Sequence, residues 1–338
     1  MKILKFLSVA VLSLMFTISA YADPVKVGFV YVGPTGDHGW TYMHDIGRQA
    51  IVKELGDQVE TTYVENVKYG PDAERVMRQM AIQGVDIIFA TSFGYMESML
   101  NVAKEFPDVK FEHATGYKTA ENMSVYSSKF YEGRYVQGVI AGHMSKAGKA
   151  GYIASFPIPE VIRGINAFYL GASSVNPDFD IDVVWVNTWY DPGKEADAAK
   201  VLISQGADII TQHTDSPAAL QVADAAGVKA FGQASDMIMF APNTQLTAIL
   251  DLWGPYYVER VKAVIDGTWE TKDTWGGMDT GMVAMAPYTN MPDDIKKIAM
   301  ALEKDILEGK LEIFPGASVG DLLGMNKYVD GIDAFLPE

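Results

Sequence analysis

Aromatic side chains stand at the points where predicted strands of this chain end. Trp40, Phe93 and Trp189 each follow an apolar, β-rich run, and His213 follows another. The loops that carry them contain Asp, His, Asn and Gln rather than basic residues. Stacking of a base on an aromatic ring contributes about 1–3 kcal/mol, and a few polar groups then fix its orientation. These residue types favour binding of a flat, uncharged heterocycle of the purine type, with a sugar as the alternative.

Two carboxylates are candidates for holding the polar edge of such a ring. Asp236 and Asp251 each follow a late strand-like run and could accept a hydrogen bond from a ring N–H or an exocyclic amine. Asp236 could instead cap the turn that follows it. We also assign Tyr31, at the end of the first strand, and Trp253, beside Asp251, to the predicted ligand site.

Patterns of catalytic, metal-binding or nucleotide-cofactor residues are weak. The five histidines form no HExxH motif, and the chain has no cysteine and no Walker A sequence. The neighbouring residues His213, Asp215 and Ser216 are too close in sequence to point at one another as a triad requires. The pairs Asp37-His38 and His44-Asp45 are more typical of charged residues in contact with solvent than of zinc ligands. We therefore predict a binding protein with no catalytic residue, no metal and no cofactor.

The elements that must position these residues alternate between strand and helix. Helical patterns of about ten or more residues separate most of the strand-like runs, and this alternation is typical of parallel α/β sheets. The predicted strands are Val25–Val32, Val59–Glu65, Asp86–Ala90, Lys110–Ala114, Gly151–Ser155, Ile181–Asn187, Asp208–Thr211, Lys229–Phe231 and Leu246–Leu250.

The chain repeats itself at an offset of about 122 residues. The segment 83–88 (QGVDII) recurs as 205–210 (QGADII), and other short matches keep the same order. The repeat predicts two similar α/β lobes whose strand ends face one cleft, joined by a hinge. We expect residues 23–130 with about 251–285 in the first lobe, and 131–250 with about 286–338 in the second.

The N-terminus is typical of an export signal. Lys2 and Lys5 precede an apolar run over 6–16, and Ala20-Tyr21-Ala22 fits a small-x-small cleavage site. We predict cleavage after Ala22 and a periplasmic protein that is not a lipoprotein, because the chain has no cysteine to carry a lipid. Its formal net charge of −16 argues against nucleic acid as a partner.

Several motifs, taken in order, resemble the BMP (basic membrane protein) family. These include 37–40 (DHGW), 132–135 (EGRY), 191–194 (DPGK), 206–210 (GADII) and 232–236 (GQASD), and the resemblance covers about 25–314. These proteins are solute-binding components of ABC transporters, related to purine nucleoside receptors. The resemblance implies a periplasmic-binding-protein type I fold with two Rossmann-like lobes, and a monomer that delivers a small ligand to permease subunits in the membrane.

This sequence departs from the family pattern at two predicted site residues, one of them at the position that contacts ribose. Trp40 occupies the place of a base-stacking phenylalanine, whereas Asp251 stands where nucleoside-binding members have a lysine that reaches the sugar. This acid in place of a base argues against a nucleoside. Four segments, 91–95 (TSFGY), 113–118 (HATGYK), 212–216 (QHTDS) and 254–257 (GPYY), resemble a proteobacterial branch of the family. That resemblance implies a free purine base, adenine in particular. The alternatives are a purine nucleoside receptor, a protein that presents its ligand to a sensor, and a periplasmic hydrolase that cleaves nucleosides.

Overall fold

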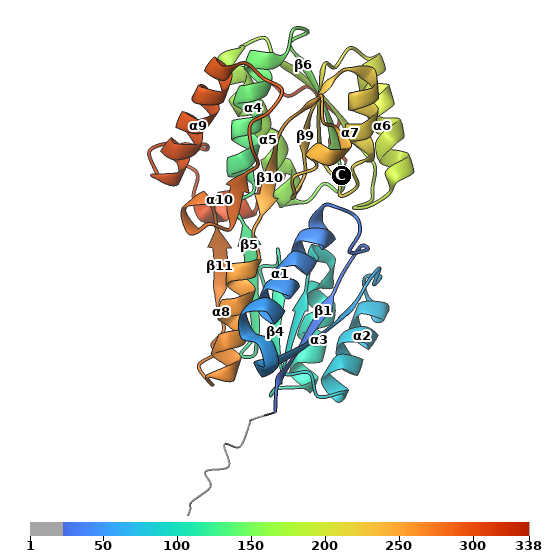
Figure 1. Cartoon of the computed structure of the whole chain (residues 1–338), viewed down its shortest axis with the longest axis vertical. Coiled ribbons are helices and arrows are strands. Elements are labelled where there is room, and N and C mark those ends of the chain that lie inside the picture. Colours follow the sequence, from blue (N-terminus) through green and yellow to red (C-terminus); the bar gives the residue numbers. More distant parts are fainter. Residues whose placement is uncertain (1–22, 338) are drawn as a thin grey trace, which may run out of the picture.

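The protein consists of two α/β lobes, one above the other in Figure 1. The computed structural model describes residues 23–337, so the predicted signal peptide over 1–22 lies outside the described residues. The first lobe contains β1 (Val25–Val30), α1 (Trp40–Leu55), β2 (Val59–Val64), α2 (Pro71–Ile82), β3 (Ile87–Ala90), α3 (Met96–Glu105), β4 (Lys110–Ala114), β5 (Met123–Ser128), α8 (Gly254–Ile265) and β11 (Asp273–Gly276). The second contains α4 (Tyr131–Met144), β6 (Lys149–Ala154), α5 (Pro159–Val175), β7 (Asp180–Trp185), α6 (Pro192–Ser204), β8 (Ile209–His213), α7 (Ala218–Ala226), β9 (Lys229–Gly232), β10 (Gln245–Asp251), β12 (Val283–Met285), α9 (Asp293–Leu307) and α10 (Val319–Leu323).

The two sheets have the same strand order. The first runs β11-β5-β4-β3-β1-β2, and the second runs β12-β10-β9-β8-β6-β7. Each strand of one sheet thus has a counterpart in the other, as the internal repeat predicts. The pairings between these strands are parallel except that of β10 with β12, which is antiparallel. The predicted α/β fold with two parallel-dominated sheets is confirmed.

The chain crosses between the lobes three times. The crossings follow β5, follow β10, and lie between β11 and β12. Because β12 pairs with β10 in the second sheet, the last crossing comes before Val283, slightly earlier than the boundary expected near 285. Sequence reasoning also missed β5, β11 and β12 as strands.

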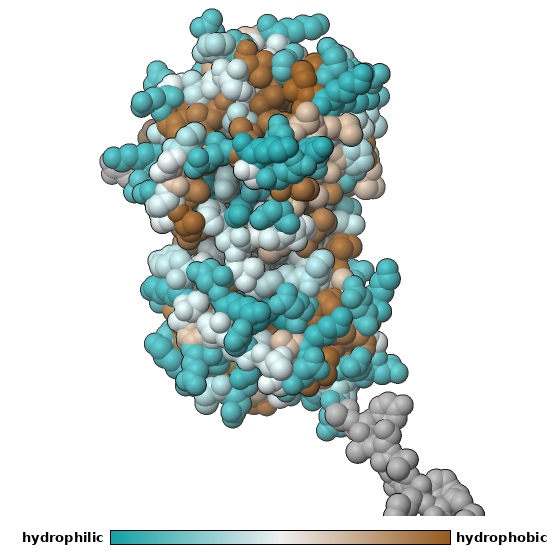
Figure 2. Space-filling model, turned by 90° about the vertical axis from the view of Figure 1, so that its left-hand side faces the viewer, coloured by the Kyte–Doolittle hydropathy of each residue, from teal (hydrophilic) through white to brown (hydrophobic). Residues whose placement is uncertain are grey.

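Each sheet is covered on both faces, as parallel sheets normally are. In the first lobe, one apolar core lies under α1 and α8 and another under α2 and α3. The second lobe also has two cores, around α4 with α5 and around α6 with α7. Figure 2 shows the molecule narrowing between its lobes, with apolar residues scattered among polar ones. Within residues 23–337, no helix combines the length and the apolar character that crossing a membrane requires.

A buried ion pair joins α8 to the sheet of the first lobe. Arg260 Nε donates to Glu112 Oε1 at 2.6 Å, and both side chains are essentially inaccessible to solvent. Tyr256 Oη and Trp269 Nε1 also donate to the Glu112 carboxylate, at 2.7 and 2.8 Å. This network holds α8, which follows the second crossing, against β4.

Candidate ligand-binding site

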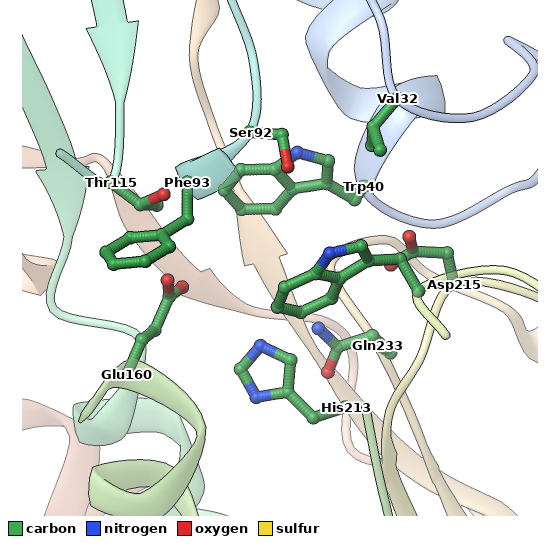
Figure 3. Close-up of a pocket in the computed structure, with 10 residues that line it drawn as sticks. Val32, Trp40, Ser92, Phe93, Thr115, Glu160, His213, Asp215 and Gln233 are labelled. Carbon is green, nitrogen blue, oxygen red and sulfur yellow. The ribbon is translucent and has the colours of Figure 1, made fainter. Parts of the chain in front are cut away.

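A cavity lies between the lobes, where the strands of both sheets end. It comprises about 340 Å³ of space free of protein atoms. Figure 3 shows residues of the first lobe on one side and residues of the second lobe on the other. The lining residues are Val32, Trp40, Ser92, Phe93, Thr115, Glu160, Trp189, His213, Asp215 and Gln233. Nearly all of them stand at or just after the carboxyl end of a strand, or at the start of the helix that follows, which is where open α/β sheets bind ligands.

The first lobe contributes an aromatic wall that is held in place by its own core. Trp40 opens α1, and its indole Nε1 donates to the Thr91 carbonyl oxygen at 2.6 Å. The His44 ring, one turn along the helix, contacts the Trp40 ring edge-on at 4.4 Å between centroids. Phe93 stands in the short 3-10 turn after β3. The orientation of the Trp40 ring is therefore fixed before any ligand arrives.

The second lobe contributes one more indole to the cavity. Trp189 lies in the loop after β7 and packs against Phe156 at 5.2 Å and His213 at 6.2 Å between ring centroids. Its carbonyl oxygen accepts from the Asp215 backbone N–H at 2.9 Å. This bond connects the loop after β7 with the loop after β8, so both move as part of one lobe.

A buried arginine orients one polar group of the cavity. Arg134, on α4, donates to Gln233 Oε1, to Thr211 Oγ1 at 3.0 Å and to the Gln212 carbonyl oxygen at 2.5 Å. Because arginine can only donate, Gln233 must present its oxygen to Arg134 and its amide N–H groups elsewhere. Figure 3 shows that amide nitrogen on the side of the cavity. Gln233 is therefore a fixed hydrogen-bond donor.

Two other polar groups of the cavity depart from their usual ionisation. Burial, followed by the positive charges of Arg134 and Arg163, holds the pKa of His213 well below its usual range, so its ring is neutral. Its Nδ1 is buried without a hydrogen-bond partner in the protein. Burial raises the pKa of Glu160 to about 7, although the charges of Arg163 and Arg134 oppose this rise. Both side chains are available to a ligand.

The lobes touch each other beside the cavity. Asp37 caps the start of α1, since its carboxylate accepts from the backbone N–H groups of Gly39 and Tyr42 at 2.8 and 2.9 Å. Gly39 then packs directly on the backbone of Asp215 in the second lobe. Ser235 Oγ, also from the second lobe, donates to the His38 carbonyl oxygen. The described conformation is thus one in which the lobes are in contact.

Two carboxyls meet at this contact. Burial raises the pKa of Asp37 to about 6, while backbone N–H groups oppose the rise. Burial also holds the pKa of Asp215 well above its usual range, and the negative charge of Asp37 adds to that effect. When the lobes are in contact, simultaneous ionisation of Asp37 and Asp215 is therefore unfavourable.

The structure brings four of the eight predicted site residues together. Trp40, Phe93, Trp189 and His213 all line the cavity. The other four, Tyr31, Trp253, Asp236 and Asp251, are not among the lining residues, and their contact with a ligand stays a prediction.

Two of the four misplaced residues belong to the core of the first lobe. Tyr31 continues the alternation of Val27 and Phe29 along β1, so its side chain points into the core, where Tyr31 Oη donates to Asp45 at 3.3 Å. Trp253 precedes α8, and its ring stacks on the buried His44 at 4.8 Å. Trp253 therefore lies in the core behind the cavity wall and does not line the cavity.

The two predicted carboxylates also lie off the cavity wall. Asp236 is exposed, and its carboxylate accepts from the Ile238 backbone N–H at 3.1 Å and from Gln245 Nε2 at 2.7 Å. These bonds hold it just before the 3-10 turn Ile238–Phe240, whose N-cap is Met237. Asp251 ends β10 and is fully buried, and both of its carboxylate oxygens lack a hydrogen-bond partner. Burial holds the pKa of Asp251 well above its usual range.

Sequence reasoning named the loops of the cavity but missed several of its polar residues. Glu160, Asp215 and Gln233 each lie in a loop expected at the cleft, yet none was assigned to the ligand site. A usable signal was their position two to five residues after a predicted strand of the second half. The sequence prediction weighted aromatic residues and so overlooked these polar positions.

A family model and curated relatives match most of the chain. The Bmp model, described as ABC transporter substrate-binding protein PnrA-like, matches residues 24–315. The chain is 61% identical to a purine-binding protein of Brucella abortus, over 94% of this chain and 95% of that protein. It is 40% identical to a putative ABC transporter glucose-binding protein of Haloferax volcanii, over 93% of this chain and 82% of that one.

Solved structures resemble the fold. A solute-binding protein of an ABC transporter system from Aeropyrum pernix superposes with a TM-score of 0.74 at 19% identity, over 88% of this chain and 97% of that one. Another, from Conexibacter woesei, gives a TM-score of 0.69 at 24% identity, over 85% and 98% of the two chains. These similarities support the periplasmic-binding-protein type I architecture.

Proposed function

We propose that this chain, which belongs to the Bmp family of ABC transporter substrate-binding proteins, captures a free purine base, with adenine as the lead ligand. The base would lie in the cavity between the lobes, stacked on Trp40 and contacted by Phe93 and Trp189. Closure of the lobes would trap it, and the loaded protein would deliver it to permease subunits. We place the protein in the periplasm, as the predicted signal peptide implies.

The observation that carries this proposal is the composition of the cavity. Three aromatic rings offer flat apolar surfaces, and Glu160, His213 and Gln233 offer hydrogen bonds. No lysine is among the lining residues, and the nearby arginines, Arg134 and Arg163, are engaged by other protein groups. Such a site suits a neutral ring and does not suit a phosphate, which would call for free cationic side chains.

The residue at position 251 favours a base over a nucleoside. By the family resemblance, nucleoside-binding members carry at this place a lysine that reaches ribose, whereas this chain has the buried carboxyl of Asp251. The purine-binding relative in Brucella abortus is consistent with a purine ligand, whereas the Haloferax volcanii relative keeps a sugar as the competing candidate.

Calorimetric titration tests the proposal. Purified protein, freed of bound ligand by unfolding and refolding, should be titrated with adenine, guanine, hypoxanthine, adenosine and glucose. We expect saturable binding of adenine, with adenosine weaker. Tighter binding of adenosine would make this a nucleoside receptor, and binding of glucose with no response to any purine would overturn the proposal. Release of free base from adenosine by the pure protein would indicate a hydrolase instead.

Replacing Trp40 by alanine should weaken adenine binding at least tenfold. One stacking surface contributes about 1–3 kcal/mol, and a loss of about 1.4 kcal/mol or more within this range corresponds to tenfold or more in affinity. Titration of Trp40→Ala and Trp40→Phe measures this, and the phenylalanine variant should recover most of the affinity. Trp185→Ala is the matched control, because Trp185 lies on β7 away from the cavity and donates to Phe335. An unchanged dissociation constant for Trp40→Ala would remove Trp40 from the site.

A further inference from the structure

Glu160 and Asp215 are the acidic residues that line the cavity, and among the described residues no group hydrogen-bonds to the Glu160 carboxyl. It stands in the first turn of α5, directly after Pro159. Figure 3 shows its carboxyl directed into the cavity, toward the side where Phe93 lies. Its ionisation depends on burial and on two arginine charges, with no hydrogen bond from a neighbouring group. This half-buried carboxyl points into the cavity, so a ligand there can supply its hydrogen-bond partner.

The hydrogen-bonding character of a carboxyl depends on its protonation. The neutral acid offers one donor beside one acceptor, whereas the carboxylate offers acceptors alone. Each edge of adenine presents a donor beside an acceptor: N6–H beside N1, N6–H beside N7, and N9–H beside N3. The neutral acid therefore complements adenine whichever edge it meets. The carboxylate instead complements two adjacent donors, which guanine presents at N1–H and N2–H.

We infer that Glu160 is the specificity-determining residue of this site, and that as a neutral acid it pairs with an edge of adenine through one donated and one accepted hydrogen bond. The inference rests on the proposed purine ligand. Stacking on Trp40, Phe93 and Trp189 cannot distinguish one purine from another, because every base has an aromatic face. Hydrogen bonding by Glu160 would supply that distinction.

The groups around Glu160 set its pKa near neutral pH, so the preference between adenine and guanine should depend on pH. Its pKa is raised to about 7 by burial. The positive charges of Arg163, one turn along α5, and of Arg134, on α4, oppose the rise. The carboxyls of Asp215, after β8, and Asp251, on β10, also interact with Glu160, as does the Tyr152 hydroxyl on β6.

The remaining neighbours of Glu160 carry no charge. His213, across the cavity, is neutral because burial holds its pKa well below its usual range. From the first lobe, the described residues that share a cavity wall with Glu160 are uncharged. They are Val32, Trp40, Ser92, Phe93, Thr115, Gly116, Tyr117 and Ser127. The first-lobe residues described around Glu160 thus add no charge to its surroundings.

The direction of the pH effect follows from the raised pKa. A group that binds adenine only when protonated gives full affinity below its pKa and loses it as the pH rises through that value. Adenine affinity should therefore fall about tenfold or more between pH 6 and pH 8.5. Guanine affinity should change in the opposite sense. Asp37 and Asp215 also titrate where the lobes meet, so the contribution of Glu160 is the pH dependence of the ratio of dissociation constants that Glu160→Gln removes.

The test compares the wild-type protein with Glu160→Gln. Tryptophan fluorescence titrations with adenine and with guanine, at pH 6, 7 and 8.5, report the ratio of dissociation constants. In the wild-type protein the preference for adenine should shrink at least tenfold over this range. Glutamine offers a permanent donor beside an acceptor, so Glu160→Gln should keep adenine affinity within about threefold of the wild-type value at pH 6 and show a ratio independent of pH.

The control is Glu195→Gln. Glu195 is a second buried carboxyl of the same lobe, outside the cavity wall, whose oxygen accepts from Ser216 Oγ at 2.7 Å. This variant should retain the pH dependence of the wild-type ratio. Adenine binding whose ratio to guanine is independent of pH in the wild-type protein would overturn the role of Glu160 and leave the purine assignment standing. Absence of binding by any purine would instead overturn the proposed function itself.

Discussion

Replacing Gly39 by alanine should weaken ligand binding by about tenfold to a hundredfold while leaving the unliganded protein folded and nearly as stable. A Cβ atom at Gly39 would meet the Asp215 carbonyl oxygen and lie 2.8 Å from the Asp215 Cα. Both atoms belong to the backbone of the opposite lobe, so neither can turn aside as a flexible side chain would. Forcing an extra carbon into a packed contact costs about 1–3 kcal/mol, which applies only to the conformation in which the lobes touch.

The same loop supplies the control for this prediction. Gly36 has open space where its Cβ would be placed, so Gly36→Ala should bind ligand as the wild-type protein does. Calorimetric titration gives the affinities, and thermal unfolding without ligand shows whether stability is intact. A Gly39→Ala protein that binds normally would mean that ligand capture does not require this contact between the lobes. Loss of stability comparable to the loss of affinity would contradict the hinge explanation.

Replacing Arg260 by methionine should destabilise the first lobe by about 3–5 kcal/mol, the cost of leaving a buried charge without its partner. Glu112 would keep hydrogen bonds from Tyr256 and Trp269 but lose the only cation of its network. Burial raises the pKa of Glu112, and the Arg260 charge opposes that rise. Without Arg260, Glu112 binds a proton more readily in the folded state, so the destabilisation should grow as the pH rises.

Urea denaturation of Arg260→Met at pH 5.5 and pH 8 measures both effects. Adding Glu112→Gln should restore part of the lost stability, because a neutral amide can still accept from Tyr256 or Trp269. Arg78→Met is the control: Arg78 forms ion pairs with Glu74 and Glu105 at the surface, where such pairs contribute little. A small effect of Arg260→Met that does not depend on pH would show that the pair is dispensable.

The repeat in the sequence accounts for much of the fold. Two βα series with matching segments at 83–88 and 205–210 imply two lobes of the same topology, and the sheets have the same strand order. The strands that link the lobes were harder to predict. β11 and β12 are only four and three residues long, and their pairing partners are distant in sequence, so neither has a periodic pattern to read.

The candidate site was predictable to the extent that it depends on position after a strand. Trp40, Phe93, Trp189 and His213 follow strands closely, and the parallel sheets bring their loops to one edge. Tyr31 and Trp253 also lie close to strand ends, yet their side chains turn into the core. The direction of a side chain beyond the end of a strand depends on packing with elements remote in sequence.

The sequence by itself determined the family, the two lobes and the loops that meet between them, because these follow from local pattern and repetition. Only the tertiary structure decided which polar groups face the cavity. Asp236 and Glu160 are both acids near strand ends, but Asp236 is exposed and hydrogen-bonded to nearby protein groups, whereas the half-buried Glu160 lines the cavity between the lobes. Burial and the charges around a carboxyl arise from segments far apart in the chain, and these surroundings set its ionisation and its available hydrogen bonds.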